Sequence, residues 1–186
     1  MGSGANPCGL MPVHVGGRDP ARRATYTAAS FEVCVKHWIV MFRPETYAAA
    51  QAHGMMAVLH SHRRRFAEVA VGDRFVAYIS RQRVLDAHGE VVSEPFEEVA
   101  QEPKGWIRYT ERARVRFDQT GAAIDARELL WGLSVCGEGI KTEPTNLLFC
   151  KGGFMEIPKD DYDWLRDVMA GRASPTPARN GQGGSP

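Results

Sequence analysis

Apolar residues run almost without interruption in one early segment of the chain and alternate with polar residues in two later segments. Residues 33–42 are almost wholly apolar, which is typical of a strand buried on both faces. Residues 74–79 and 112–117 follow the two-residue period of a strand. In the later segment, arginines occupy one face and apolar side chains the other. The pattern therefore predicts a strand in each of the three segments.

Turn residues mark where these strands begin and end. Gly72-Asp73 directly precedes the strand at 74–79, and we expect it to set the first hairpin of the sheet. A second strand is predicted to begin at Gly89 and to end at Pro95, because proline cannot continue a strand ladder. Two more short strands are expected at residues 147–150 and 154–157.

Helical signals lie between the strands. Pro44 fits the first turn of a helix over residues 45–53, and Gly54 suits its C-cap. Asp125 is expected to cap another helix, with Glu128 completing a capping box. A helical turn is expected at residues 63–69, and Pro158 opens a final helix. The apolar face of that final helix is formed by Tyr162, Leu165, Val168 and Met169.

Short strands separated by turns favour an α+β fold, a pseudo-β-barrel of five to six mixed strands flanked by helices, over a parallel α/β sheet. Residues 33–170 are the predicted domain. Residues 1–32 are expected to be a flexible leader, or sequence upstream of the true start, since Met11 and Met41 also occur. Residues 171–186 lack large apolar side chains and are expected to form a disordered tail.

Composition and charge argue against several classes of protein. The 186 residues carry a net charge of +1, which argues against a protein that coats nucleic acid and allows a local basic face. No apolar run reaches the roughly 20 residues of a membrane helix, and no export signal is evident, so a cytoplasmic location is expected. Cys8, Cys34, Cys136 and Cys150 are scattered and are expected to be reduced thiols.

No motif for a metal, a cofactor or catalysis stands out. The cysteines form no C-x-x-C pair, and His60 and His62 have no H-E-x-x-H or deaminase context. The glycine pairs near residues 137–139 and 151–153 are too short for a phosphate-binding loop. We therefore expect no resident metal or cofactor and no catalytic residues.

The order of several motifs resembles EVE domains, which belong to the PUA-like superfamily together with YTH and ASCH domains. Trp38-Ile39-Val40 followed by Arg43-Pro44-Glu45 is similar to their first strand and helix. Residues 71–78 and 89–96 resemble their central Gly-Asp strand and the strand after it. Residues 149–164 resemble the closing strand and helix. The resemblance covers residues 37–169.

The resemblance implies a non-catalytic module that captures a flipped, modified base, such as a modified cytosine or adenine, of DNA or RNA in an aromatic-lined pocket. Partner proteins of defence systems are also implied, because bacterial relatives tend to accompany them. Some relatives carry a tryptophan near Met56 or Leu147, where this chain has none. The expected base pocket consists of Trp38, Phe42, Met56, Tyr78 and Trp106.

The phosphate backbone is expected to contact a basic rim, because guanidinium groups bind phosphate with two hydrogen bonds. Its members are His62, Arg63, Arg65, Arg81, Arg112 and Arg114. Two alternatives remain open on the same barrel. One is an ASCH-like RNA-processing nuclease in which Arg63, Arg65 and Glu94 act. The other is a small-molecule sensor, because a fold does not determine its function.

Overall fold

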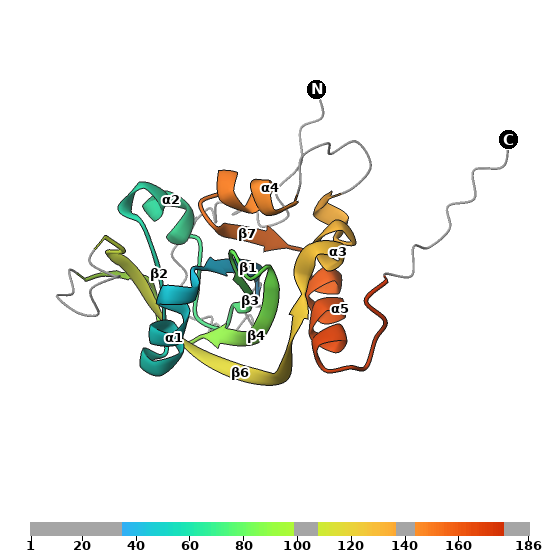
Figure 1. Cartoon of the computed structure of the whole chain (residues 1–186). Helices are drawn as coiled ribbons and strands as arrows, with labels where there is room; N and C mark the ends of the chain where they lie inside the picture. Colours follow the sequence, from blue (N-terminus) through green and yellow to red (C-terminus); the bar gives the residue numbers. More distant parts are fainter. Residues whose placement is uncertain (1–34, 99–107, 137–143, 177–186) are drawn as a thin grey trace, which may run out of the picture. The chain divides into compact units, whose positions relative to one another are not determined.

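The computed structural model describes residues 35–98, 108–136 and 144–176, which form an α+β domain (Figure 1). Its strands are β1 (His37–Phe42), β2 (Met55–Val58), β3 (Arg74–Ile79), β4 (Val84–Val91), β5 (Phe96–Glu97), β6 (Glu111–Asp125) and β7 (Phe154–Ile157). Its helices are α1 (Pro44–His53), α2 (Arg63–Phe66), α3 (Ala126–Trp131), α4 (Pro144–Cys150) and α5 (Lys159–Met169), with short 3₁₀ turns η1 (His60–His62) and η2 (Ser134–Cys136).

The strands form one curled, mixed sheet in the order β2-β6-β4-β3-β1-β7, and β5 pairs with β6. β1 and β3 are parallel, with Trp38 opposite Phe75, and the other pairs are antiparallel. The long strand β6 bends, so it pairs with β4 along one part and with β2 along another (Figure 1). The predicted α+β pseudo-barrel with flanking helices is confirmed, with seven strands among the described residues where five to six were expected.

Both faces of the central strands are buried, and each face belongs to a different core. Trp38, Val40 and Phe42 of β1 point into the barrel, where they pack with alternate residues of β3 and β4. Ile39 points outward to the second core, which α3, α4 and α5 cover. Because side chains alternate along a strand, one run of apolar residues supplies both layers. The inward face of α5 consists of Tyr162, Leu165, Val168 and Met169, as predicted.

The carboxylate of Asp73 joins the start of β3 to the start of β1. It accepts hydrogen bonds from the backbone N–H of Lys36 at 2.9 Å, from Trp38 Nε1 at 2.9 Å and from the backbone N–H of Ala70 at 3.1 Å. The carbonyl of Asp73 also accepts from the N–H of Val91 in β4 at 2.8 Å. Asp73 is buried, so these donors replace the water that the carboxylate loses on folding.

Two predicted strands differ from the observed elements. Residues 147–150 lie in helix α4, which begins at Pro144, because a short apolar run is compatible with a buried helix as well as with a strand. The predicted strand from Gly89 to Pro95 instead ends at Val91 in β4, and Pro95 separates it from β5. The hairpin between β3 and β4 turns at residues 80–83, so Gly72-Asp73 is not its turn.

The helix boundaries follow the expected caps closely. Helix α1 begins at Pro44, and Gly54 ends it in the left-handed conformation with φ 58°. Asp125 caps α3 by accepting a hydrogen bond from the N–H of Arg127, but among the described residues Glu128 does not complete the expected capping box. The expected leader lies outside the described residues, and so does the expected tail beyond residue 176, so the domain boundaries stay predictions.

Replacing Asp73 with Ala should lower the free energy of unfolding by about 3 kcal/mol or more, because each buried donor left unpaired costs about 1–3 kcal/mol. Trp38→Phe removes one of those donors and keeps a buried aromatic ring, so it should cost less, about 1–2 kcal/mol. Urea denaturation followed by circular dichroism measures both values. A smaller loss for Asp73→Ala than for Trp38→Phe would contradict the central role of the carboxylate.

Candidate functional site

A cavity of about 380 Å³ opens where β1 ends, beside β2. The sheet order begins at β2 and finishes at β1 and β7, so no strand pairing joins β2 to β1 or to β7. The cavity occupies this unpaired seam of the barrel. Its walls are Val40, Met41, Phe42, Arg43, Thr46, Ala57, Val58, Leu59, His62, Ser80, Arg81, Tyr109, Gly152 and Gly153.

The floor of the cavity is apolar and the rim is polar. Val40, Phe42 and Val58 are buried residues of the inner core, and their side chains are held by the barrel. Arg43 and Arg81 at the rim are exposed to solvent. A flat apolar ligand with polar edges matches this distribution, because the floor excludes water while the rim offers hydrogen bonds.

Two polar side chains of the wall have hydrogen-bonding capacity to spare. The backbone N–H of Ser80 donates to the carbonyl of Phe42 at 2.8 Å, which fixes the serine at the end of β1. Within the described ranges, neither the Ser80 hydroxyl nor the ring of His62 bonds to another side chain or to the backbone. Both groups can therefore donate to or accept from a ligand.

Arg81 adopts a strained backbone conformation at the rim. Its φ is 67°, in the left-handed region that residues with a Cβ seldom occupy. The tight β3–β4 turn holds it there, with the N–H of Arg83 donating to the carbonyl of Ile79 at 2.9 Å. Arg81 Nη1 donates to Glu45 Oε1 at 2.7 Å, which holds the guanidinium against the first turn of α1. Strain of this kind often accompanies a functional position.

Helix α1 is fixed at its first turn and along its buried face. The Thr46 hydroxyl lies on the backbone of Arg43, donating to its carbonyl at 3.1 Å and accepting from its N–H at 3.3 Å. The Tyr47 hydroxyl donates to Asp86 Oδ2 in β4 at 2.6 Å. Burial, together with this bond to Asp86, raises the pKa of Tyr47. The tyrosine therefore stays a neutral donor, and the wall made by α1 stays in place.

Two glycines before β7 complete the wall opposite α1. Gly152 has φ 76°, and a Cβ there would lie 2.5 Å from His62 Nδ1. Gly153 has φ 79°, and a Cβ there would lie 3.1 Å from the Met41 side chain. The Gly153 carbonyl accepts from the N–H of Met41 at 2.7 Å. The His62 ring thus packs directly on the glycine backbone, where a larger residue would displace it.

The expected base-pocket residues divide between the cavity and the core. Phe42 lines the cavity. Trp38 is fully buried and bonded to Asp73, and Met56 is fully buried in the same inner core, so neither forms a cavity wall. Tyr78 faces the outer core, on the opposite face of the sheet. Trp106 lies outside the described residues.

The expected phosphate contacts are also dispersed. His62 and Arg81 line the cavity, and Arg114 is exposed on β6. Arg112 is buried instead: its Nε donates to the Tyr109 carbonyl and its Nη1 to Glu98, both at 3.1 Å, so it cannot reach a phosphate. Arg65 is half-buried on α2, with its Nε enclosed.

Several wall residues were not among the expected ones. Arg43 follows the first strand directly, and Ser80 and Tyr109 flank strands whose positions the sequence did indicate. Their position at strand ends was a usable signal, because the ends of strands meet at one rim of a barrel. The contribution of Gly152 and Gly153 had no comparable signal, since it depends on a fold-back from β7 onto β1.

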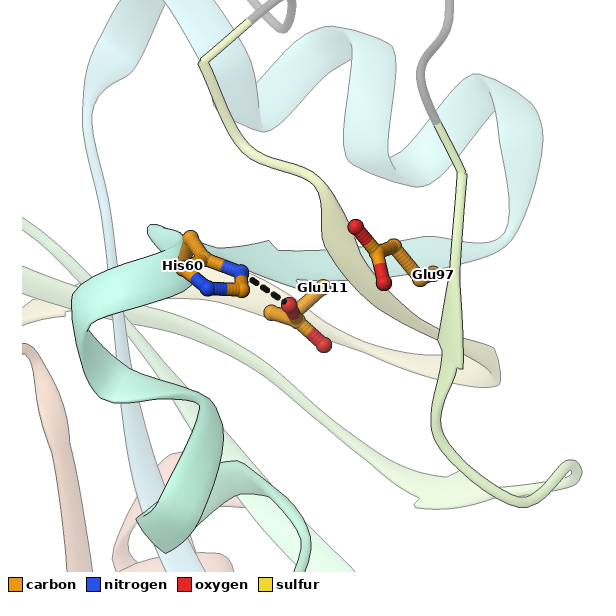
Figure 2. A group of neighbouring side chains, drawn as sticks. All are labelled: His60, Glu97 and Glu111. Carbon is orange, nitrogen blue, oxygen red and sulfur yellow. Dashed lines mark hydrogen bonds and ion pairs between the residues drawn. The ribbon is translucent and has the colours of Figure 1, made fainter.

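A second polar group lies beside the cavity, around the buried carboxylate of Glu111 (Figure 2). His60 Nδ1 is 2.8 Å from Glu111 Oε1, and the Glu97 carboxylate approaches from β5. Arg63, expected at the phosphate backbone, lies 3.7 Å from Glu97 Oε2 and 3.8 Å from Glu111 Oε2. Among the described residues this is the arrangement that offers three neighbouring ligand atoms to a metal.

Comparisons with known proteins identify the fold. No family model and no curated protein matches the chain. The YTH domain of Zygosaccharomyces rouxii MRB1, in complex with N6-methyladenosine RNA, is similar over 76% of this chain and 88% of its own, with TM-score 0.55 and 11% identity. The YTH domain of mmi1, in a complex with RNA, is similar over 73% of this chain and 81% of its own, with TM-score 0.51 and 17% identity.

A hypothetical protein from Leishmania major is also similar, over 74% of this chain and 96% of its own, with TM-score 0.54 and 11% identity. The chain thus has a YTH/PUA-like α+β fold. Membership of the EVE family stays a prediction from sequence. The chain also contains, in its described parts, no helix long and apolar enough to cross a membrane.

Gly152→Ala should lower the free energy of unfolding by about 2–3 kcal/mol, of which about 1–2 kcal/mol is left-handed backbone strain and the rest the clash with His62. Gly171→Ala is the matched control, because Gly171 has φ 68° and no atom within 4 Å of the added Cβ. Urea denaturation measures the loss of unfolding free energy in both variants. The loss in Gly171→Ala gives the backbone strain alone, and the extra loss in Gly152→Ala gives the clash with His62. Equal losses would contradict the packing of His62 on Gly152.

Proposed function

We propose that this protein is a non-catalytic reader that captures one flipped-out, modified base of a nucleic acid in the seam cavity. The observation that carries the proposal is the cavity itself, with an apolar floor and a polar rim in a YTH/PUA-like fold. Its 380 Å³ lies near the lower end of the range of about 300–1,000 Å³ for small-molecule pockets. That size suits a single base and leaves the neighbouring nucleotides outside.

Binding would begin with stacking of the base in the cavity. Phe42 forms part of the floor, and Tyr109 and His62 are half-buried aromatic rings in the wall. Stacking of a base on an aromatic ring contributes about 1–3 kcal/mol, which offsets the cost of taking the base out of its strand. A methyl group on the base would add apolar surface against Val40 and Val58.

The polar edge of the base would be read by groups that have free capacity. The Ser80 hydroxyl can donate or accept, and the ring nitrogens of His62 can form hydrogen bonds to the base. Because one complex of the compared YTH domains contains N6-methyladenosine RNA, we propose modified adenine in RNA as the first ligand to test. Modified cytosine, and DNA in place of RNA, are the next candidates.

The phosphates beside the flipped base would meet the cationic rim. Arg43 and Arg81 are exposed and line the cavity, and Arg64 and Arg114 are exposed elsewhere on the domain. Each phosphate contact releases condensed counterions, so affinity should fall as the salt concentration rises. The net charge of +1 restricts this attraction to the rim and limits non-specific coating.

The nuclease alternative receives less support. It required Arg63 and Arg65 to act with Glu94, but Arg63 is directed to Glu97 and Glu111 instead. We therefore propose binding without turnover. The cytoplasmic location and the defence-system partners likewise stay proposals that derive from the resemblance to EVE domains.

Tyr109→Ala should weaken binding of an RNA that contains N6-methyladenosine by about 5–150-fold, which corresponds to the 1–3 kcal/mol of one stacking contact. Fluorescence anisotropy with a short labelled single strand measures the dissociation constant. Trp131→Ala is the matched control, because Trp131 is an exposed aromatic on α3 that does not line the cavity. That control should leave the affinity unchanged.

The same assay should compare modified and unmodified strands, in RNA and in DNA, with methylated adenine and methylated cytosine. A reader should prefer at least one modified strand, and the preference should disappear in the Tyr109→Ala protein. Equal affinity for every strand, with no loss on Tyr109→Ala, would refute the proposed function.

Arg81→Gly should stabilise the fold while it weakens nucleic-acid binding. Glycine relieves left-handed strain of about 1 kcal/mol, whereas loss of the guanidinium should lower the slope of log affinity against log salt by about one. Arg83→Gly is the matched control, because Arg83 has φ 58° but does not line the cavity. It should gain similar stability and keep its affinity, as measured by thermal unfolding and anisotropy at several salt concentrations. Equal binding by both variants would show that Arg81 does not contact the ligand.

A further inference from the structure

We propose that His60, Glu97 and Glu111 form a binding site for a divalent transition-metal ion of the zinc class, beside the cavity and distinct from it. One ligand atom from each residue lies within 4.8 Å of the other two. The ligands come from three separate elements, η1, β5 and β6, and they point toward one another (Figure 2). A sequence motif could not reveal them, because Glu111 is 51 residues away from His60.

The sheet register places the two carboxylates directly against each other. Glu97 is the cross-strand partner of Glu111 in the β5–β6 pair. Like charges in directly opposite positions destabilise a strand pair, so a positive charge between them would remove a repulsion that the register creates. Only 6% of the Glu111 side chain is exposed, so water screens this repulsion poorly on that side.

Arg63 lies near both carboxylates but forms no close hydrogen bond with either one. Arg63 reaches Glu97 at 3.7 Å and Glu111 at 3.8 Å, well beyond the roughly 2.7–2.9 Å of a charge-assisted hydrogen bond. Its side chain is 58% exposed, so it can swing away without disturbing the core. Arg112, the next residue of β6, forms its own ion pair with Glu98 at 3.1 Å.

The donor set indicates which ions fit. Carboxylate oxygens together with one imidazole nitrogen suit Zn²⁺, which binds such ligands at about 2.0–2.2 Å. His60 and Glu97 are exposed and can move the short distance that bonding requires, whereas Glu111 is fixed by burial. An ion in place of the 2.8 Å contact between His60 and Glu111 would keep both groups paired. Three protein ligands leave at least one position open to water.

A metal at this position would fix one wall of the cavity. His60 lies between Leu59 and His62, which both line the cavity, and Glu111 lies two residues after Tyr109, which also lines it. The ion would thus bind η1 to the β5–β6 pair and hold these wall residues in place.

The test is zinc binding by the full chain, measured by competition with a chromophoric chelator and by isothermal titration calorimetry. Wild-type protein should bind one Zn²⁺ that the variants His60→Ala and Glu97→Gln bind at least about 10–100-fold more weakly. Both substituted residues are exposed, so the variants should fold. Because cysteines and other histidines of the chain also bind zinc, the difference between wild type and variant is the measured quantity.

Arg63→Gln should bind zinc several-fold more tightly than wild type, because it removes the competing cation from both carboxylates. Arg64→Gln is the matched control, since it removes the same charge from an exposed neighbour that has no ion pair with any described residue. Co²⁺ should give a ligand-field spectrum with wild type and with Arg63→Gln that is lost in Glu97→Gln. Unchanged zinc affinity in both His60→Ala and Glu97→Gln would overturn the proposed site.

Discussion

The fold depends on one buried carboxylate. Asp73 accepts N–H groups from the segment before β1, from the Trp38 ring and from the turn before β3, and its carbonyl reaches β4. Parallel β1 and β3 need such a connection at their starts, because no tight turn can join parallel strands. The Gly-Asp turn therefore sets the register between the strands that form the barrel, and the cavity lies at the opposite end of the same strands.

That register explains why binding capacity is concentrated at one end of β1. Near its start, Trp38 is enclosed by Asp73 and Phe154, so its buried ring is not accessible to a ligand. Near its end, the chain leaves the strand at Arg43, β2 pairs only with β6, and a gap remains. The packed end thus provides the rigidity that an open end requires for a preformed site.

Much of the fold could be predicted from sequence, because alternation, caps and turns are local properties. The sequence did not allow us to predict which residues line the cavity. Trp38 and Phe42 share one face of one strand and look equivalent by period, and only their depth in the barrel separates them. Arg112 likewise shares a face with Arg114. However, β5 and the segment at Tyr109 cover Arg112, whereas Arg114 stays exposed. The helix at 144–150 was missed because four apolar residues carry no decisive period.

The seam has a mechanical consequence. In a closed barrel every strand pairs with two neighbours, but here β2 and β7 are edge strands that do not pair with each other. A ligand in the cavity would contact β2 and the segment just before β7, and would thereby link these two edges. Such a link would make the sheet stiffer when the cavity is filled than when it is empty.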